Sequence, residues 1–257
     1  MISGIIGHPL KNPRSIPIWK NFFQKNSISS EMIKWDVPSS DFNEFISDLL
    51  INQDFLATAI TMPYKKLALN YADSMDISAK SSNSTNLLIK DRKKIIAYNT
   101  DVIGAENTLK KIISYYDKIL IIGFGGSGEA IYRYFKDIYK NKTLNVVSSK
   151  NIKDKNFITK LTKEHILKKS ILINCTPLGS DLSDGYIQEF PFNEELLNFV
   201  NPETLIFDII YSPDKTKLFY ECKKRNIKYI NGLNMNTHQA NLALNLVQKA
   251  YLRNEKI

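Results

Sequence analysis

The strongest candidate for chemistry in this sequence is a glycine-rich loop that follows an apolar run. Residues 118–122 lead directly into Gly-Phe-Gly-Gly-Ser-Gly at 123–128 and then into a helical pattern. This order is typical of dinucleotide-binding proteins, because the N-terminus of the helix offers free N–H groups to phosphates. The alternative is a glycine-rich turn that binds no ligand. The residues that we predict to bind the dinucleotide phosphates are Gly123, Gly125, Gly126, Ser127 and Gly128.

The residues after the next predicted strand indicate which dinucleotide fits. Residues 144–147 are followed by Ser148, Ser149 and Lys150, none of which is acidic. An NAD site usually has Asp or Glu here to bind the ribose 2′-hydroxyl. Two hydroxyls and a cation suit a 2′-phosphate better, so we predict NADP (NADPH). The preference should be modest because lysine lacks the bidentate geometry of arginine. The alternative is that Lys150 is an ordinary surface lysine.

The glycine loop lies in a half of the chain where strands and helices alternate. This alternation predicts βαβ units and a mostly parallel sheet. We expect strands at residues 118–122, 144–147, 171–174, 205–209 and 228–230. We expect helices at residues 127–136, 215–226 and 235–251.

The first half shows the same alternation less regularly and predicts βαβ units and a mostly parallel sheet there as well, so the whole chain is predicted to be of the α/β class. Asp41 is a plausible N-cap for one of its helices. We expect strands at residues 2–7, 32–37 and 57–62 and a hairpin of 86–89 with 95–97. We expect helices around residues 18–23, 42–50 and 65–71.

Composition excludes several other classes of protein. The chain has 257 residues, of which 43% are hydrophobic and 24% charged, as in ordinary globular proteins. Its net charge is +9, but the basic residues are scattered rather than clustered, so we expect no nucleic-acid partner. No apolar run is long enough to cross a membrane, and the N-terminus does not resemble a signal peptide. We therefore expect a cytoplasmic protein with no membrane partner. The two cysteines, Cys175 and Cys222, predict neither a disulfide framework nor a metal site.

Several separated segments occur in the order found in shikimate dehydrogenases, and the sequence resembles that family over nearly its whole length. The most specific are Thr61-Met-Pro-Tyr-Lys65 and Asn99-Thr-Asp101. The others are Gly7-His-Pro-Leu10 with Ser15, Asn86-Leu-Leu88, the glycine loop, Ile173-Asn-Cys-Thr-Pro-Leu-Gly179, Asp208-Ile-Ile-Tyr-Ser-Pro213 and Asn231-Gly-Leu233 with Gln239.

The resemblance implies a shikimate-binding α/β domain at residues 1–100 and a Rossmann-like NADP-binding domain at residues 101–234. Residues 235–257 are expected to form a helix that packs back on the first domain. Lys65 and Asp101 match the catalytic pair of the family, which reduces the carbonyl of 3-dehydroshikimate with hydride from NADPH. In such a pair, the ammonium stabilises the charge developing on oxygen and the carboxylate holds the ammonium. Without the resemblance, Lys65 would be interpreted as a surface lysine and Asp101 as a helix N-cap.

The resemblance also assigns roles to other positions. The residues that match substrate contacts are Ser15, Thr61, Asn86, Tyr211 and Gln239. The residues that match the cofactor-flanking loops are Thr176, Pro177, Leu178 and Gly232. Taken alone, Thr61 and Asn86 are ordinary polar residues of a strand end and a turn.

Some positions depart from the family pattern. Pro13 stands where the family has its first carboxylate-binding serine, and proline has neither a hydroxyl nor an N–H. The adjacent Arg14 either replaces the missing donor or points to solvent. Ala59 stands in place of an asparagine, and Ser149 in place of the cofactor-binding arginine. A catalytic pair that survives while neighbouring contacts drift is typical of a divergent family member.

The sequence therefore predicts an NADP-dependent shikimate dehydrogenase of aromatic amino acid (chorismate) biosynthesis, active as a monomer or homodimer. One alternative is a related oxidoreductase that acts on quinate, an aminoshikimate or another cyclic polyol acid. The other alternative is a non-catalytic nucleotide-binding homologue. Retention of both Lys65 and Asp101 weighs against a binding module, whereas Pro13 weighs slightly in its favour.

Overall fold

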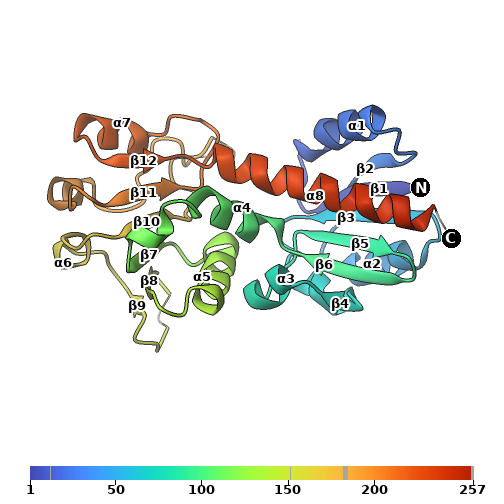
Figure 1. Cartoon of the computed structure of the whole chain (residues 1–257), viewed down its shortest axis with the longest axis horizontal. Helices are drawn as coiled ribbons and strands as arrows, with labels where there is room; N and C mark the ends of the chain where they lie inside the picture. Colours follow the sequence, from blue (N-terminus) through green and yellow to red (C-terminus); the bar gives the residue numbers. More distant parts are fainter. Residues whose placement is uncertain (12, 151, 182–184, 256–257) are drawn as a thin grey trace. The chain divides into compact units, whose positions relative to one another are not determined.

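The computed structural model describes residues 1–11, 13–150, 152–181 and 185–255, which form two compact units (Figure 1). The first unit comprises Met1–Ile103 and His238–Ile257, and the second comprises Gly104–Thr237. Residues 12, 151, 182–184 and 256–257 of the predicted domains lie outside the described residues. The predicted functional domain boundaries, at 100/101 and 234/235, stay a prediction.

The first unit contains a mixed six-stranded sheet in the order β2-β1-β3-β5-β6-β4. Strands β2 and β3 flank β1 in parallel, whereas β5 pairs antiparallel with both β3 and β6. Because β5 runs against β3, the start of β5 lies at the same edge as the end of β3. The strands are β1 (Ile2–Gly7), β2 (Glu31–Asp36), β3 (Phe55–Ile60), β4 (Ser74–Met75), β5 (Leu87–Asp91) and β6 (Lys94–Tyr98).

Both faces of this sheet are covered, because neighbouring strand residues point to opposite sides. Ile5 packs into a cluster with Trp19 and Val247, whereas Ile6 packs on the other side with Phe42 and Ile46. Helices α1 and α8 contribute side chains to the first cluster, and α2 contributes side chains to the second. The helices are α1 (Ser15–Lys25), α2 (Phe42–Ile51) and α3 (Ile77–Ser82), with a 3-10 helix η1 (Leu67–Tyr71); α4 (Thr100–Leu109) and α8 (Leu233–Asn254) each have residues in both units.

The second unit contains a six-stranded sheet in which every pair is parallel, in the order β12-β11-β10-β7-β8-β9. Buried parallel strands have nearly continuous apolar sequences, as β7 and β10 do. The strands are β7 (Lys118–Ile122), β8 (Thr143–Val147), β9 (Phe157–Ile158), β10 (Ile171–Asn174), β11 (Leu205–Asp208) and β12 (Lys228–Ile230). The helices are α5 (Gly126–Ile138), α6 (Lys163–Ile166) and α7 (Lys217–Lys224), with 3-10 helices η2 (Ile113–Tyr115) and η3 (Glu194–Phe199).

The α/β class, the parallel sheet around the glycine loop and the β5–β6 hairpin confirm the sequence prediction. The helix predicted around residues 65–71 is present at Leu67–Tyr71, as a 3-10 helix rather than an α-helix. Asp41 precedes α2, but its side chain makes no capping hydrogen bond and instead accepts one from Ser40. Strands β4 and β9 and helices α3, α4 and α6 were not predicted; most are too short to show a hydrophobic period.

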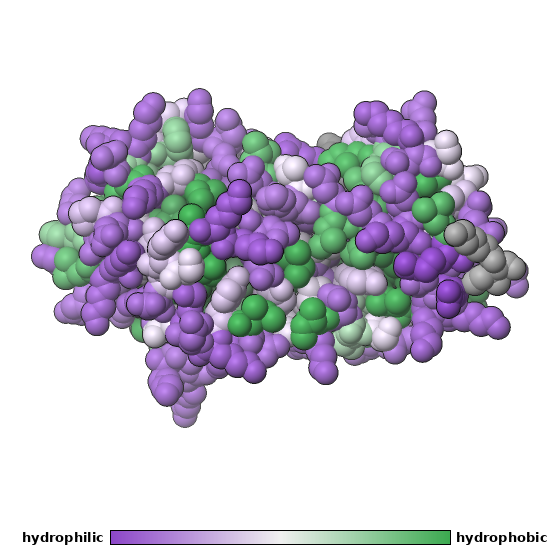
Figure 2. Space-filling view, viewed as in Figure 1, coloured by the Kyte–Doolittle hydropathy of each residue, from purple (hydrophilic) through white to green (hydrophobic). Residues whose placement is uncertain are grey.

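Hydrophilic side chains cover most of the face drawn in Figure 2, with hydrophobic ones scattered between them. Apolar side chains gather instead in the clusters on the sheet faces. In the part of the chain that the structure describes, no helix is both long and apolar enough to span a bilayer.

Candidate functional site

Backbone hydrogen bonds bring three predicted site residues of the first unit to one edge of its sheet. Thr61 follows β3, and its N–H donates to the carbonyl of Ile6 at 2.9 Å. Asn86 precedes β5, and its carbonyl accepts from the N–H of Ile60 at 2.8 Å. The carbonyl of Lys65 accepts from the N–H of Thr85 at 2.7 Å. Thr61 and Asn86 thus lie at the adjoining ends of β3 and β5, and the Lys65 backbone is bonded to the residue before Asn86.

The predicted catalytic pair is in direct contact. Lys65 Nζ donates to Asp101 Oδ2 at 2.7 Å, and about a quarter of each side chain is exposed (26% and 25%). Asp101 lies in the first turn of α4, where the partial positive charge of the helix favours a carboxylate. The ammonium is therefore held by an ion pair yet remains accessible to a small molecule.

A second set of predicted residues is connected through Thr100. Asn86 Nδ2 donates to Thr100 Oγ1 at 2.9 Å, and Asn86 Oδ1 accepts from the Thr100 N–H at 2.8 Å. Thr100 Oγ1 in turn donates to Gln239 Oε1 at 3.2 Å. Asn86 and Gln239 are 153 positions apart in the sequence, and the fold brings both amides onto one threonine that directly precedes Asp101.

The structure reveals a buried support that the sequence analysis missed. Asn99 is 1% exposed, and its Nδ2 donates to Ser82 Oγ at 3.0 Å and to the carbonyl of Ser84 at 3.1 Å. Its N–H donates to Ser78 Oγ at 3.0 Å. These bonds fix the turn from β6 into α4 and so fix the position of Asp101. The only sequence signal was the place of Asn99 in the Asn-Thr-Asp motif.

Ser15, the predicted carboxylate ligand, is the first residue of α1, in the segment that follows β1. Its Oγ is buried and has no hydrogen-bond partner among the described residues. Buried hydroxyls in folded proteins nearly always have a partner, so this atom is suited to a bound acceptor. Arg14 occupies the N-cap of the same helix and is exposed, and Pro13 precedes it.

The glycine loop of the second unit has the backbone of a phosphate cradle. Gly123 has a φ of +94°, which disfavours side chains. A Cβ on Gly128 would lie 2.1 Å from the carbonyl oxygen of Gly123, so the helix packs tightly on the strand. At Gly125 and Gly126 a Cβ would meet none of the described atoms within 4 Å. The loop is thus tightly packed at Gly123 and Gly128 and open at Gly125 and Gly126, where the 13-residue helix α5 begins.

The residues after β8 lie beside this loop. Lys150 Nζ donates to the carbonyl of Phe124, in the glycine loop, at 3.2 Å. Ser148 is buried and its Oγ accepts from the N–H of Lys150 at 3.1 Å, whereas Ser149 is exposed. An open backbone cradle with a cation and no acid beside it fits a dinucleotide that carries a 2′-phosphate.

The other predicted cofactor residues lie at the carboxyl ends of the neighbouring strands. Thr176 touches the glycine loop, because its Cγ2 lies 2.8 Å from where a Cβ on Gly123 would be. Pro177 is exposed and Leu178 half-buried. Gly232 donates from its N–H to the carbonyl of Ile210 at 2.9 Å, so the loops after β11 and β12 are in contact. Tyr211 is half-buried in the first of these loops.

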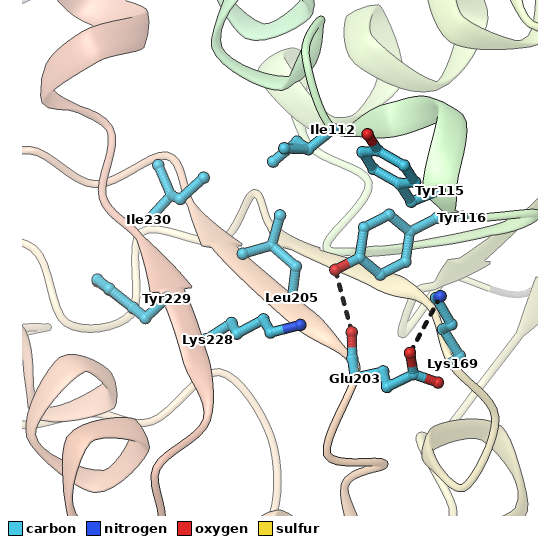
Figure 3. A pocket seen from close by; sticks show the side chains of 9 residues that line it. All are labelled: Ile112, Tyr115, Tyr116, Lys169, Glu203, Leu205, Lys228, Tyr229 and Ile230. Carbon is cyan, nitrogen blue, oxygen red and sulfur yellow. Dashed lines mark hydrogen bonds and ion pairs between the residues drawn. The ribbon is translucent and has the colours of Figure 1, made fainter.

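One cavity of the second unit, of about 620 Å³, lies at the opposite, amino ends of the strands (Figure 3). It contains none of the predicted site residues. Within it, Lys169 pairs with Glu203 at 3.3 Å, and Tyr116 OH donates to the carbonyl of Glu203 at 3.0 Å. The residues that line it are Ile112, Tyr115, Tyr116, Lys169, Glu203, Leu205, Lys228, Tyr229 and Ile230.

The cysteines are free and buried, as the sequence predicted. Burial raises the pKa of the Cys222 thiol to about 12 and raises that of Cys175 as well, so neither provides a thiolate near neutral pH. In the described ranges, no group of three or more His, Cys, Asp or Glu side chains is arranged to hold a metal ion.

The family model for the shikimate dehydrogenase substrate-binding domain matches residues 5–88. The chain is 27% identical to the shikimate dehydrogenase (NADP(+)) of Clostridium botulinum strain 657, over 95% of both sequences. It is 29% identical to that of Staphylococcus epidermidis strain ATCC 35984, over 91% of this chain and 87% of the relative. A chorismate mutase/shikimate 5-dehydrogenase fusion from Clostridium acetobutylicum has the same fold, with a TM-score of 0.77, 24% identity and coverage of 99% and 97%.

Proposed function

Because this chain belongs to the shikimate dehydrogenase family, we propose that it interconverts 3-dehydroshikimate and shikimate with NADP(H). The first unit binds the substrate and the second binds the cofactor. The observation that carries the proposal is the 2.7 Å contact of Lys65 with Asp101, beside the Asn86–Thr100–Gln239 network. A purely nucleotide-binding module would need neither.

The reduction requires one hydride on the carbonyl carbon and one proton on the carbonyl oxygen. NADPH, when bound, supplies the hydride. The Lys65 ammonium stabilises the negative charge that develops on the oxygen and donates the proton. Asp101 holds the ammonium in place and accepts hydrogen bonds from the substrate hydroxyls. Removal of such an electrostatic group typically lowers kcat by about 100-fold or more.

The other proposed substrate contacts are residues of the first unit, except Tyr211, which belongs to the second. Ser15 Oγ donates to the substrate carboxylate, which satisfies its unmet hydrogen bond. Arg14, at the N-terminus of α1, supplies the donor that Pro13 cannot. The residues proposed to bind the ring hydroxyls and line the substrate site are Thr61, Asn86, Gln239 and Tyr211.

The cofactor contacts follow from the second unit. The open backbone above Gly125 and Gly126 receives the pyrophosphate, with Ser127 and the first N–H groups of α5 as donors. Ser148, Ser149 and Lys150 bind the 2′-phosphate. The loop of Thr176, Pro177 and Leu178, together with Gly232, borders the nicotinamide.

Pro13 and Ala59 favour a second candidate, an oxidoreductase of the same family with another cyclic polyol acid as substrate. Quinate and an aminoshikimate are the two that share the carboxylate and ring. The loss of one carboxylate donor is the specific observation behind this candidate.

A spectrophotometric assay distinguishes these possibilities. The purified protein is mixed with NADP and either shikimate or quinate, and absorbance at 340 nm is followed. We expect kcat/KM for shikimate to exceed that for quinate by at least about tenfold, because the two acids share the carboxylate but differ at the ring groups that the site must accommodate. A preference for quinate supports the second candidate, and no reduction of NADP with either compound contradicts both.

The remaining features of the proposal concern the cell. We propose that the protein acts in the cytoplasm, as a monomer or homodimer, in the synthesis of chorismate. Its scattered positive charge helps to attract the anionic substrate and cofactor. Light scattering of the purified protein determines the oligomeric state.

A further inference from the structure

Asp208 is a fully buried carboxylate at the carboxyl end of β11, and it has no role in the reaction described above. Its exposure is 0%, and it accepts four hydrogen bonds. Oδ1 accepts from Asn174 Nδ2 at 3.0 Å and from the N–H of Ile210 at 3.2 Å. Oδ2 accepts from Thr216 Oγ1 at 3.1 Å and from Tyr229 OH at 2.9 Å. Burial raises the pKa of Asp208, and these donors oppose the rise.

The donors come from four segments that meet at one edge of the sheet. Asn174 ends β10, Ile210 follows β11, Thr216 caps α7 and Tyr229 lies in β12. A single carboxylate therefore connects the loops after β10 and β11 to the supporting helix and edge strand. A buried charge is retained at such a cost only where its hydrogen bonds are complete, as they are here.

Asn174 links Asp208 to the loop that begins at Cys175, beside the proposed cofactor site. Its amide donates to Asp208, which fixes the amide orientation and leaves Oδ1 pointing toward Thr176. Asn174 Oδ1 accepts from the N–H of Thr176 at 3.0 Å and from Thr176 Oγ1 at 2.7 Å. Thr176 Oγ1 then accepts from the N–H of Leu178 at 3.3 Å.

Thr176 packs against the glycine loop. Its Cγ2 and N lie 2.8 and 3.2 Å from where a Cβ on Gly123 would be. Cys175, between Asn174 and Thr176, donates from its N–H to the carbonyl of Ile122 at 2.8 Å. A rotation of the Asn174 amide would release Thr176 and so alter the wall of the phosphate loop.

We propose that Asn174 and Asp208 are positioning residues for NADP(H): the carboxylate orients the Asn174 amide, which holds the Thr176–Leu178 backbone against the glycine loop. This inference rests on the proposed function, because it assigns NADP(H) to that loop. Neither residue contacts the reacting atoms. Their effect is on cofactor binding and leaves the substrate contacts of the first unit unchanged.

The test compares Asn174→Ala with Tyr229→Phe. Each removes one donor to the Asp208 carboxylate, but only the first severs the link to Thr176. The dissociation constant of NADPH is measured by its fluorescence on binding, and the KM for 3-dehydroshikimate is measured at saturating NADPH. We expect Asn174→Ala to weaken NADPH binding by roughly tenfold with an unchanged substrate KM. Tyr229→Phe should stay within about twofold of the parent.

Equal NADPH affinities for Asn174→Ala and the parent would overturn the proposal. Equal weakening by Asn174→Ala and Tyr229→Phe would also overturn it, because that result reports general destabilisation. If the parent itself binds no NADPH, the proposed function fails, and this inference fails with it. Normal NADPH binding and turnover by Asn174→Ala would refute the positioning role alone.

A second pair of variants serves if Asn174→Ala does not fold. Thr176→Val removes the hydroxyl that bonds Asn174, whereas Thr176→Ser retains it. Thr176→Ser should bind NADPH several-fold more tightly than Thr176→Val, as expected for one restored hydrogen bond of about 1 kcal/mol. Equal affinities of the two variants would contradict the relay through Thr176.

Discussion

The two units present their candidate sites in different ways. In the first, side chains from segments far apart in the sequence meet: Lys65 on Asp101, and Asn86 and Gln239 on Thr100. In the second, the site is mainly backbone, namely an open glycine loop at the N-terminus of α5 with a lysine beside it. The first arrangement contains an ammonium that could donate a proton and stabilise charge, whereas the second offers an open backbone with N–H donors.

This difference explains which departures each site tolerates. A backbone site depends on small residues rather than on one functional group, so we expect the residue type at Ser149 to affect cofactor affinity more than mechanism. A side-chain site loses a whole contact with each such substitution, and we propose that Pro13 removes one contact with the substrate carboxylate. Substitutions that alter one kind of site and leave the other unchanged can therefore test this difference.

The largest effect is expected for Gly128→Ala, which tests the backbone cradle. The new methyl would lie 2.1 Å from the carbonyl oxygen of Gly123, and such overpacking costs roughly 1–3 kcal/mol. We expect a lower melting temperature and loss of measurable NADPH binding by calorimetry. Gly125→Ala is the control, because its Cβ meets no described atom and its backbone is extended. Gly125→Ala should keep the parental melting temperature and weaken NADPH binding only. If Gly128→Ala keeps the melting temperature and the NADPH affinity of the parent, the glycine loop is not the phosphate-binding site.

Arg14→Ala tests the side-chain site. If Arg14 replaces the donor lost at Pro13, kcat/KM for shikimate should fall by roughly 10- to 150-fold, the equivalent of a 1.5–3 kcal/mol charge-assisted bond. The KM for NADP should not change. Lys20→Ala, an exposed cation on α1, provides the charge control, and Pro13→Ser should improve shikimate turnover. If neither Arg14→Ala nor Pro13→Ser alters shikimate kinetics, the carboxylate binds elsewhere and another substrate must be considered.

Lys150→Asp tests cofactor choice. Removal of a cation beside the glycine loop should shift the ratio of kcat/KM values from NADP toward NAD by about tenfold. Lys140→Asp, just beyond the other end of α5, makes the same change of charge and should leave the ratio as it is. Equal use of both cofactors by the parent, with no response to Lys150→Asp, would remove these residues from the 2′-phosphate site.

The smallest effect concerns pH. Burial raises the pKa of Asp208 in the folded state. The Asp208 carboxyl group therefore binds a proton more tightly in the folded protein than in the unfolded chain. The contribution of Asp208 to stability is therefore fully present below the ordinary pKa of an aspartate and is lost as pH rises through the raised value. In urea unfolding, the stability of the parent relative to Asp208→Asn should decrease as pH rises from 4. An increase would show that the pKa of Asp208 is lowered instead.

Sequence reasoning performed differently for the two units. The second is readable because β7 and β10 are continuous apolar runs and β7 leads directly into the glycine loop, so β7, β10 and the start of α5 are predicted to within a residue. In the first, α4 begins inside the Asn-Thr-Asp motif, and its polar first turn gives no hydrophobic period from which a helix could be predicted. The serines of residues 78–84 resemble a surface turn, yet Ser78, Ser82 and Ser84 are buried and hydrogen-bonded.

The site itself shows the same limit. The motifs selected Lys65 and Asp101, but no local pattern indicates that Thr100 joins Asn86 to Gln239, because that contact spans 139 positions. The sequence likewise indicates no role for Asn174 and Asp208 beyond their places in two of the motifs. Each is the last residue of a parallel strand, and only the sheet register places the two side chains together.

The most direct test of the account is a single turnover of 3-dehydroshikimate by saturating NADPH, followed at 340 nm. The variants are Lys65→Ala and Asp101→Asn, with Lys66→Ala as a control that removes an exposed neighbouring cation. The account predicts that Lys65→Ala slows the step by about 100-fold or more while the NADPH dissociation constant is unchanged. Asp101→Asn should slow it as well, and Lys66→Ala should not. Turnover by Lys65→Ala within about threefold of the parent would show that the Lys65–Asp101 pair is not the catalytic centre.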